Sequence, residues 1–198
     1  YFNGVFPPGK KDVKLAGVVM ENLLNAHVEV YNSLKRMAYG QEVEIGIVKN
    51  IFQFDPSSRW NILDWYISGI LNDIYTNSPL EFLKYGKSSF YMPGMVNREM
   101  NNEEAVGSLD FIGLNYYSRM HVKGQLFKSE PFIFKIREED IQTDMAYSMY
   151  PEGLYRALKT ISFLELPIII TENGVADASD SIRSTFIKQY LYATSRAL

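Results

Sequence analysis

The chain has 198 residues, of which 46% are hydrophobic and 14% aromatic, a balance that suits a packed globular domain and excludes a disordered chain. Its net charge of −3, with acidic and basic residues interspersed, excludes the basic face that nucleic acid or an anionic membrane surface requires. The composition therefore favours a small, uncharged ligand.

The sequence contains no cysteine and no Asn-x-Ser/Thr acceptor for N-linked glycans. No apolar run reaches the roughly 20 residues of a membrane span. The start, YFNGVFPPGK, lacks the basic and apolar regions of a signal peptide. We therefore expect a cytoplasmic protein that is not inserted in a membrane.

The first third of the chain predicts two helices with a strand between them. Apolar residues at helical spacing predict a helix over Val13–Met37. The β-branched run from Glu42 to Asn50 predicts a buried parallel strand. A second helix is expected over residues 61–75.

A shorter helix is expected next, with Ser78 and Pro79 as its cap and first turn and Gly86 as its end. Residues 87–104 are predicted to form a loop with a helical patch. Residues 109–118 are then expected to form the second strand.

The remaining sequence predicts a long loop and one more helix, strand and helix. Residues 119–150 are expected to be irregular, and the charge cluster REED, residues 137–140, is interpreted as a solvated loop. A helix begins near Pro151, a strand runs from Ile168 to Glu172, and Asp180 is expected to cap the last helix.

The predicted elements alternate between helix and strand, which favours an α/β fold with about three parallel strands covered by helices. Three strands do not close a barrel. Because a complete TIM (β/α)₈ barrel takes about 250 residues, we predict a partial TIM barrel, the middle to later part of one.

Polar side chains end two of the predicted strands. Alternation along the strand places Asn115 and Tyr117 on one face, and in the last strand it groups Glu172 with Ile168 and Ile170. A glutamate after a strand is more often an exposed loop acid, a tyrosine pair more often packs, and an amide often satisfies a turn. Their combination at the carboxyl ends of parallel strands instead favours a site with carboxylate chemistry.

The sequence offers little else for catalysis. His27, inside the first helix, is interpreted as a structural hydrogen-bonder, and His121 lies in the predicted irregular segment. Two histidines without cysteine do not predict a metal site, and neither a glycine-rich phosphate loop nor a nucleophile-elbow motif occurs. We therefore expect no metal and no cofactor.

The segments ITENG, DFIGLNYYS and YPEGLYRAL closely resemble family 1 glycoside hydrolases, the β-glucosidase family, and the resemblance extends over nearly all of the chain. It implies a (β/α)₈ barrel that hydrolyses β-glycosides with retention of configuration. Residues 1–198 would be a single catalytic-domain fragment that covers roughly strands 5 to 7.

The resemblance also implies roles for four residues. Glu172 falls on the nucleophile of the Thr-Glu-Asn-Gly motif, Tyr117 on the tyrosine that hydrogen-bonds it, and Asn115 on a residue of the sugar-binding floor. Tyr147 occupies a position where many relatives carry tryptophan near the leaving group, which implies a changed aglycone preference.

The family's acid/base glutamate lies in an Asn-Glu-Pro motif, which this sequence does not contain. We therefore expect the chain to supply the nucleophile half of a β-glycosidase, with the remainder of the barrel as its partner, a β-glycoside as substrate and little activity on its own. The alternatives are a non-catalytic, klotho-like barrel that binds sugar or a partner, and an inactive truncated fragment. The sugar, the aglycone and the oligomeric state are not predicted.

Overall fold

The computed structural model describes residues 4, 7–126, 128, 130–145 and 147–198. The chain divides into two compact units, the first made of Tyr1–Ile47 and Asp73–Phe111 and the second of Val48–Asn72 and Ile112–Leu198. The expectation of one domain over residues 1–198 stays a prediction.

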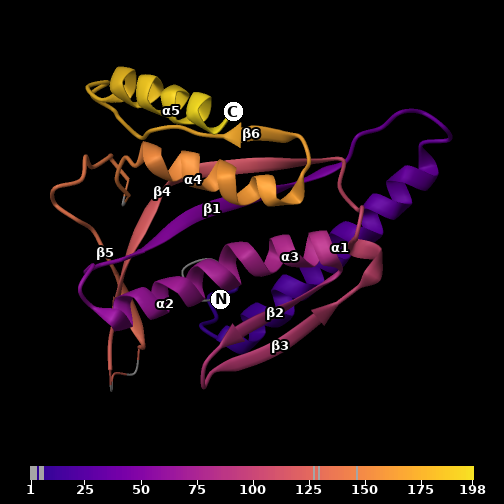
Figure 1. The fold of residues 1–198 in the computed structure, drawn as a ribbon, viewed down its shortest axis with the longest axis horizontal. Helices are drawn as coiled ribbons and strands as arrows, with labels where there is room; N and C mark the ends of the chain where they lie inside the picture. The colour runs from indigo at the N-terminus through magenta and orange to yellow at the C-terminus, as the bar shows by residue number, and fades with distance from the viewer. Residues whose placement is uncertain (1–3, 5–6, 127, 129, 146) are drawn as a thin grey trace. The chain divides into compact units, whose positions relative to one another are not determined.

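The chain contains both helices and strands, but the predicted alternation is interrupted by the pairs β2–β3 and β4–β5, which were not predicted (Figure 1). In chain order they are α1 (Val13–Met37), β1 (Gly46–Pro56), α2 (Ile62–Asn72), the π-helix Asp73–Asn77, α3 (Ser78–Tyr85), β2 (Lys87–Met92), β3 (Val96–Asn101), the 3₁₀ helix Glu103–Ala105, β4 (Phe111–Gly124), β5 (Phe132–Lys135), α4 (Pro151–Ile161), the 3₁₀ helix Ser162–Leu164, β6 (Ile168–Glu172) and α5 (Arg183–Ala197). The predicted helix over Val13–Met37 and the predicted strand over Ile168–Glu172 are confirmed with their bounds.

Helix α1 is the longest element of the first unit. The Asp12 side chain caps it by accepting the backbone N–H of Leu15 at 3.0 Å. His27 Nε2 donates to the carbonyl oxygen of Ser108 at 2.8 Å, which confirms the structural role predicted for this histidine. In the part of the chain that the structure describes, no helix has both the length and the apolar character needed to cross a membrane.

The loop predicted over residues 87–104 is wrong, because β2 and β3 form an antiparallel hairpin there, with Met92 paired to Val96 at its tip. The turn contains Pro93 and Gly94, whose positive φ of 70° favours glycine, and it closes with a 3.0 Å bond from Met95 N–H to the Met92 carbonyl. The hairpin packs against α1 and α3 (Figure 1).

The cap predicted at Ser78 is also wrong. Helix α2, the π-helix and α3 follow one another without a loop, and the residue before Ser78 already has helical φ and ψ angles. Ser78 is buried inside this helical stretch, and its hydroxyl lies 3.3 Å from that of Ser88. Gly86 does end α3 in the left-handed conformation, as predicted.

The second unit is organised around β4, which pairs with β1, β5 and β6 in a four-stranded sheet. Strand β6 runs parallel to β4, whereas β5 runs antiparallel. The irregular excursion predicted over residues 119–150 is therefore wrong in its first half, because β4 continues to Gly124 and the chain returns as β5. Residues 127, 129 and 146 of this excursion lie outside the described residues.

Helices α4 and α5 lie side by side next to β4 and β6 (Figure 1). Ile112, Leu114 and Tyr116 of β4 are completely buried, and Leu154 of α4 and Phe186 of α5 are buried as well. Tyr116 also links the sheet to the helix by a hydrogen bond, because its hydroxyl donates to the carbonyl of Tyr150 at the start of α4. This face of β4 thus carries the core of the unit.

The cap of α5 differs from the prediction. Asp177, not Asp180, accepts the backbone N–H groups at the start of the helix, from Ile182, the residue before α5, at 2.8 Å and from Arg183 at 3.1 Å. Asp180 instead has a positive φ of 56° and forms an ion pair with the Arg183 side chain. The carboxylate three residues earlier is the one that reaches the helix end, because the intervening chain turns back on itself.

The closeness of α4 to β4 gives a stability prediction. A Cβ atom on Gly153 would lie 1.9 Å from the Tyr116 hydroxyl oxygen and 2.7 Å from the Tyr150 ring, so Gly153→Ala forces α4 away from the sheet. We expect the free energy of unfolding to fall by about 3 kcal/mol, as for other overpacked cores. Urea denaturation followed by circular dichroism measures it.

Gly69→Ala is the matched control, because Gly69 also lies in a helix but a Cβ atom there meets no neighbour within 4 Å. This change should raise stability by up to about 1 kcal/mol, the helix propensity difference. Equal effects of the two substitutions would contradict the close contact at Gly153.

Candidate functional site

The register between β4 and β6 decides which side chains meet. Ile168 pairs with Ile112 and Ile170 with Leu114, so the first and third of the three consecutive isoleucines share the buried face of β4. The expectation that they lie on the same face as Glu172 is therefore wrong. Plain alternation continued along β6 would have turned Glu172 towards the helices.

A register shift after Leu114 changes this outcome. The next paired residues are Asn115 and Glu172, so Thr171 is an extra residue in β6, as in a β-bulge. Both Thr171 and Glu172 are exposed and reach side chains on the same face of β4. The bulge is the local feature that delivers the predicted nucleophile to the face where Asn115 and Tyr117 lie.

The central contact of the site joins the ends of these two strands. The Tyr117 hydroxyl donates to Oε2 of Glu172 at 2.8 Å. This hydrogen bond to a carboxylate, followed by burial, raises the pKa of Tyr117 above its ordinary value, so the phenol stays protonated and remains a donor. Two side chains 55 positions apart in the sequence are thus held as one unit.

Two neighbours of Glu172 that the sequence did not single out fix this part of β6 to β4. Thr171 Oγ1 donates to Oδ1 of Asn115 at 2.6 Å, and Asn173 Nδ2 donates to the carbonyl of Tyr116 at 2.7 Å. Glu172 therefore lies between two anchored residues. The sequence did contain a sign of these contacts, because polar residues that can form hydrogen bonds, Thr171 and Asn173, directly flank Glu172.

Gly113 allows the strands to approach closely on the face that carries the site. A Cβ atom there would lie 2.9 Å from Cγ2 of Val48 and 3.1 Å from Cγ2 of Thr171. Val48 of β1 and Ile169 of β6 are about half exposed on this face, at 50% and 47%. The face thus combines polar groups at the strand ends with exposed apolar groups below them.

The fourth predicted residue, Tyr147, reaches the site from the loop before α4. Its ring centroid lies 6.1 Å from that of Tyr117, at a tilt of 53°. Asp144, in the same loop, receives the backbone N–H of Ala178 at 2.5 Å and donates its own N–H to Ala176 at 2.9 Å. The loop that carries Tyr147 is therefore tied to the segment that follows Glu172.

An ion-pair network joins the segment before this loop to β4. Arg119 of β4 forms two bonds to Asp140, at 2.8 and 3.0 Å, and lies 3.5 Å from Asp55. Burial acts to raise the pKa of Asp140, but the hydrogen bonds from Arg119 and His121 outweigh it and hold the pKa below its ordinary value. The interpretation of residues 137–140 as a solvated loop is thus wrong for Asp140.

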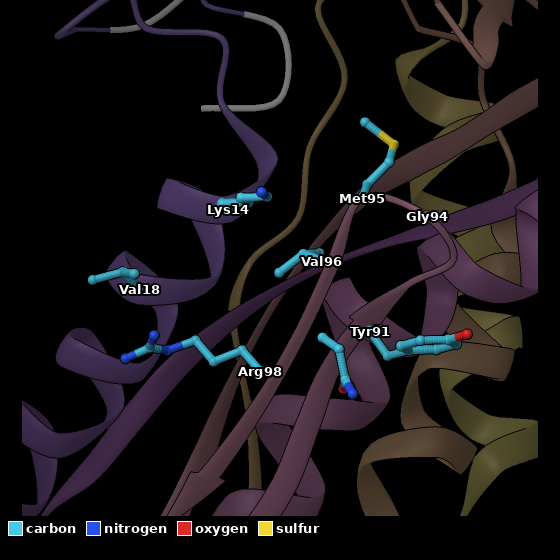
Figure 2. Close-up of a pocket in the computed structure, with 8 residues that line it drawn as sticks. Lys14, Val18, Tyr91, Gly94, Met95, Val96 and Arg98 are labelled. Atoms are coloured by element: carbon cyan, nitrogen blue, oxygen red, sulfur yellow. The ribbon is translucent and has the colours of Figure 1, made fainter.

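A separate groove of about 520 Å³ lies in the first unit and holds none of the predicted site residues. Figure 2 shows Lys14 and Val18 of α1 on one side and the β2–β3 hairpin on the other, with Arg98 extending towards the helix. Arg98 pairs with Glu21 of α1. Among the described residues, no group of three or more His, Asp or Glu side chains is placed to hold a metal ion.

Comparison with known sequences agrees with the resemblance. The sequence model of glycosyl hydrolase family 1 matches residues 1–198. The chain is 26% identical over 225 residues to a beta-galactosidase of Pyrococcus woesei, covering 97% of this chain and 42% of that protein. It is 31% identical over 189 residues to a 1,4-beta-D-glucan glucohydrolase of Thermotoga neapolitana, covering 87% of this chain and 42% of that protein. The chain thus spans less than half the length of these relatives.

Comparison with solved structures agrees as well. The beta-glycosidase from Pyrococcus horikoshii matches with a TM-score of 0.83 and 30% sequence identity, covering 100% of this chain and 44% of that chain. The match and the parallel strands flanked by helices confirm the predicted fold class, part of a TIM (β/α)₈ barrel.

Proposed function

Because the chain belongs to glycosyl hydrolase family 1, we propose that it forms the nucleophile half of the active site of a retaining β-glycosidase. The observation that carries the proposal is the 2.8 Å hydrogen bond from the Tyr117 hydroxyl to Glu172 at the ends of two neighbouring strands. A carboxylate held in this way can attack along a fixed direction, which nucleophilic catalysis requires.

In the proposed first step, an oxygen of Glu172 forms a bond to the anomeric carbon of the sugar while the bond from that carbon to the aglycone oxygen breaks. A carboxylic acid protonates the departing oxygen, and a glycosyl ester of Glu172 remains. Water then attacks the same carbon, the conjugate carboxylate accepts its proton, and Glu172 is released. Two inversions give net retention.

The acid/base carboxyl must lie about 5 to 5.5 Å from the nucleophile in a retaining enzyme. We place it outside these 198 residues, because the sequence contains no Asn-Glu-Pro motif and spans only 42% of the two relatives compared. The exposed Val48 and Ile169 side chains beside the site support the same idea, since further strands of a barrel would cover them. We therefore expect the 198-residue chain alone to hydrolyse little.

The proposal assigns Asn115 to the sugar and Tyr147 to the aglycone. Because Oδ1 of Asn115 accepts the Thr171 hydroxyl, Asn115 would meet a sugar hydroxyl through its NH₂ group, as a donor. Tyr147 offers an aromatic face beside Tyr117, which suits the apolar side of a sugar ring or an aromatic aglycone.

Covalent labelling tests the proposed nucleophile directly. The complete protein is incubated with a 2-deoxy-2-fluoro β-glucoside, and in parallel with the corresponding galactoside, each carrying dinitrophenolate as the leaving group. The fluorine slows both steps, but the good leaving group allows the first, so the glycosyl ester accumulates. We expect mass spectrometry of the digested protein to find the label on Glu172, and the faster of the two reagents indicates the preferred sugar.

Glu172→Gln is the matched control and should take no label. A label on another carboxylate in the unsubstituted protein would refute the assignment. A protein that binds the glycoside, as judged by calorimetry, but neither turns it over nor becomes labelled would support the non-catalytic alternative.

A further inference from the structure

Tyr190 of α5 is buried directly behind the site, at 2% exposure. Its ring stacks on that of Phe186, one helical turn earlier, with centroids 3.9 Å apart and planes 23° apart. The ring also lies 6.2 Å from that of Tyr116, the residue next to Tyr117. Such packing leaves the ring few alternative positions.

The hydroxyl of Tyr190 connects three elements. It donates to the carbonyl oxygen of Tyr117 in β4 at 3.2 Å and accepts the backbone N–H of Tyr150, the residue that precedes α4, at 2.9 Å. A hydroxyl carries one hydrogen and can accept as well, so both bonds form at once. One buried atom of α5 thus bridges β4 and the start of α4.

Tyr150 is held from several directions, which makes it a firm support for this bridge. Its carbonyl accepts the Tyr116 hydroxyl at 2.8 Å, and the guanidinium of Arg119 lies 3.9 Å from the centre of its ring. Arg156 also donates to its hydroxyl at 3.3 Å. Tyr150 belongs to the YPEGL motif, for which the proposed chemistry has no direct use.

The position of the Tyr117 backbone determines where its hydroxyl lies relative to Glu172. The phenol oxygen is at the far end of a rigid side chain, so a small displacement or rotation of the backbone moves it relative to Glu172. Misplacement of an active-site group by about 1 Å can cost about a hundredfold in rate. Burial raises the pKa of Tyr190 well above its ordinary value, so the hydroxyl stays protonated and keeps donating to Tyr117.

We propose that Tyr190 is a positioning residue: its hydroxyl, anchored on Tyr150, fixes the Tyr117 backbone so that the Tyr117 phenol stays on Glu172. This inference rests on the proposed function, because it assigns Tyr190 an effect on the nucleophile. It does not require Tyr190 to touch the substrate.

The test is a double-mutant cycle in the complete protein. Initial rates with a dinitrophenyl β-glycoside are measured for the unsubstituted protein, Tyr190→Phe, Tyr117→Phe and the double variant. We expect Tyr190→Phe to lower kcat by about 5- to 30-fold, the scale of one hydrogen bond, with KM changed by less than about 2-fold. In the Tyr117→Phe background, Tyr190→Phe should cost less than about 2-fold, since the phenol that it positions is already gone.

Tyr192→Phe is the matched control, because Tyr192 lies on the same helix but is 66% exposed, and kcat should not change. If Tyr190→Phe does not stay folded, Phe186→Leu replaces it in the cycle, because this change loosens the Tyr190 ring while keeping its hydroxyl. The inference would be overturned if Tyr190→Phe lowered kcat by the same factor in the unsubstituted protein and in the Tyr117→Phe variant. It would also be overturned if Tyr190→Phe raised KM and left kcat unchanged.

The labelling experiment separates this inference from the proposed function. Absence of a label on Glu172 would refute both, because Tyr117 would then have no nucleophile to orient. A label on Glu172 combined with independent effects of Tyr190→Phe and Tyr117→Phe would refute only the role of Tyr190.

Discussion

Replacing Glu172 by glycine is expected to lower kcat of the complete protein by about 10⁴- to 10⁶-fold, the scale seen when a catalytic nucleophile is removed. The expected loss is this large because no glycosyl ester can form, so the remaining route is direct attack by water. Because Glu172 is an exposed residue at the end of β6, the fold should be largely unaffected. Rates with a dinitrophenyl β-glycoside and circular dichroism measure the two effects.

Azide provides the decisive part of this experiment. The glycine variant leaves a space at the position of the carboxylate, so azide can attack the anomeric carbon from that side and expel dinitrophenolate. A single inversion gives an α-glycosyl azide, which proton NMR identifies by the coupling of its anomeric hydrogen. Formation of the β-azide, or no rescue at all, would count against Glu172 as the nucleophile.

Glu152→Gln is the matched control for charge. Glu152 is another glutamate of the second unit, lies at the start of α4 and pairs with Arg196 at 3.2 Å. Its removal should leave kcat unchanged, and azide should produce no azide product. Comparable losses for the two carboxylates would mean that the effect at Glu172 reflects charge or folding and not nucleophilic attack.

Much of the fold follows from local patterns. The 3.6-residue spacing of apolar side chains predicted α1 with its bounds, and Gly86 predicted the end of α3 through the left-handed conformation that glycine tolerates. Tertiary pairing was harder to predict. The β2–β3 hairpin was missed although Pro93 and Gly94 mark its turn, because its strands contain charged and amide residues on the exposed side.

The site shows a second limit of local patterns. The sequence predicted that Glu172, Asn115 and Tyr117 lie together, but by assuming strict alternation along β6. The structure reaches the same grouping through an irregularity, the extra residue Thr171. A bulge is a property of two paired strands, so the sequence of one strand does not reveal it.

The supporting residues were beyond sequence reasoning for a similar reason. Tyr190 lies 73 positions after Tyr117, and Asp140 lies 21 positions after Arg119, so their contacts depend on how separate elements pack. A tyrosine at a helical spacing from a phenylalanine predicts only a buried stripe. The direction in which its hydroxyl points becomes known only when the strand beneath the helix is placed.

Tyr117→Phe carries the second large expected effect. The substitution keeps the ring beside Tyr147 and removes the hydroxyl that lies 2.8 Å from Glu172. We expect kcat to fall by about 10- to 1,000-fold, comparable to loss of a preorganised donor in other active sites. Without the Tyr117 hydroxyl, the Glu172 carboxylate loses the hydrogen-bond donor that fixes its orientation and stabilises its negative charge. We therefore expect the substitution to lower kcat more than it weakens substrate binding.

Pre-steady-state measurements show which of the two chemical steps the Tyr117→Phe substitution slows. With a dinitrophenyl β-glycoside, a burst of dinitrophenolate reports formation of the glycosyl ester, and the later steady rate reports its hydrolysis. Tyr155→Phe is the matched control, because this tyrosine of α4 contacts Arg196 through its ring, which the substitution keeps. If Tyr117→Phe slowed neither phase by more than about 2-fold, the bond between Tyr117 and Glu172 would be a packing feature of the strand ends and not a part of catalysis.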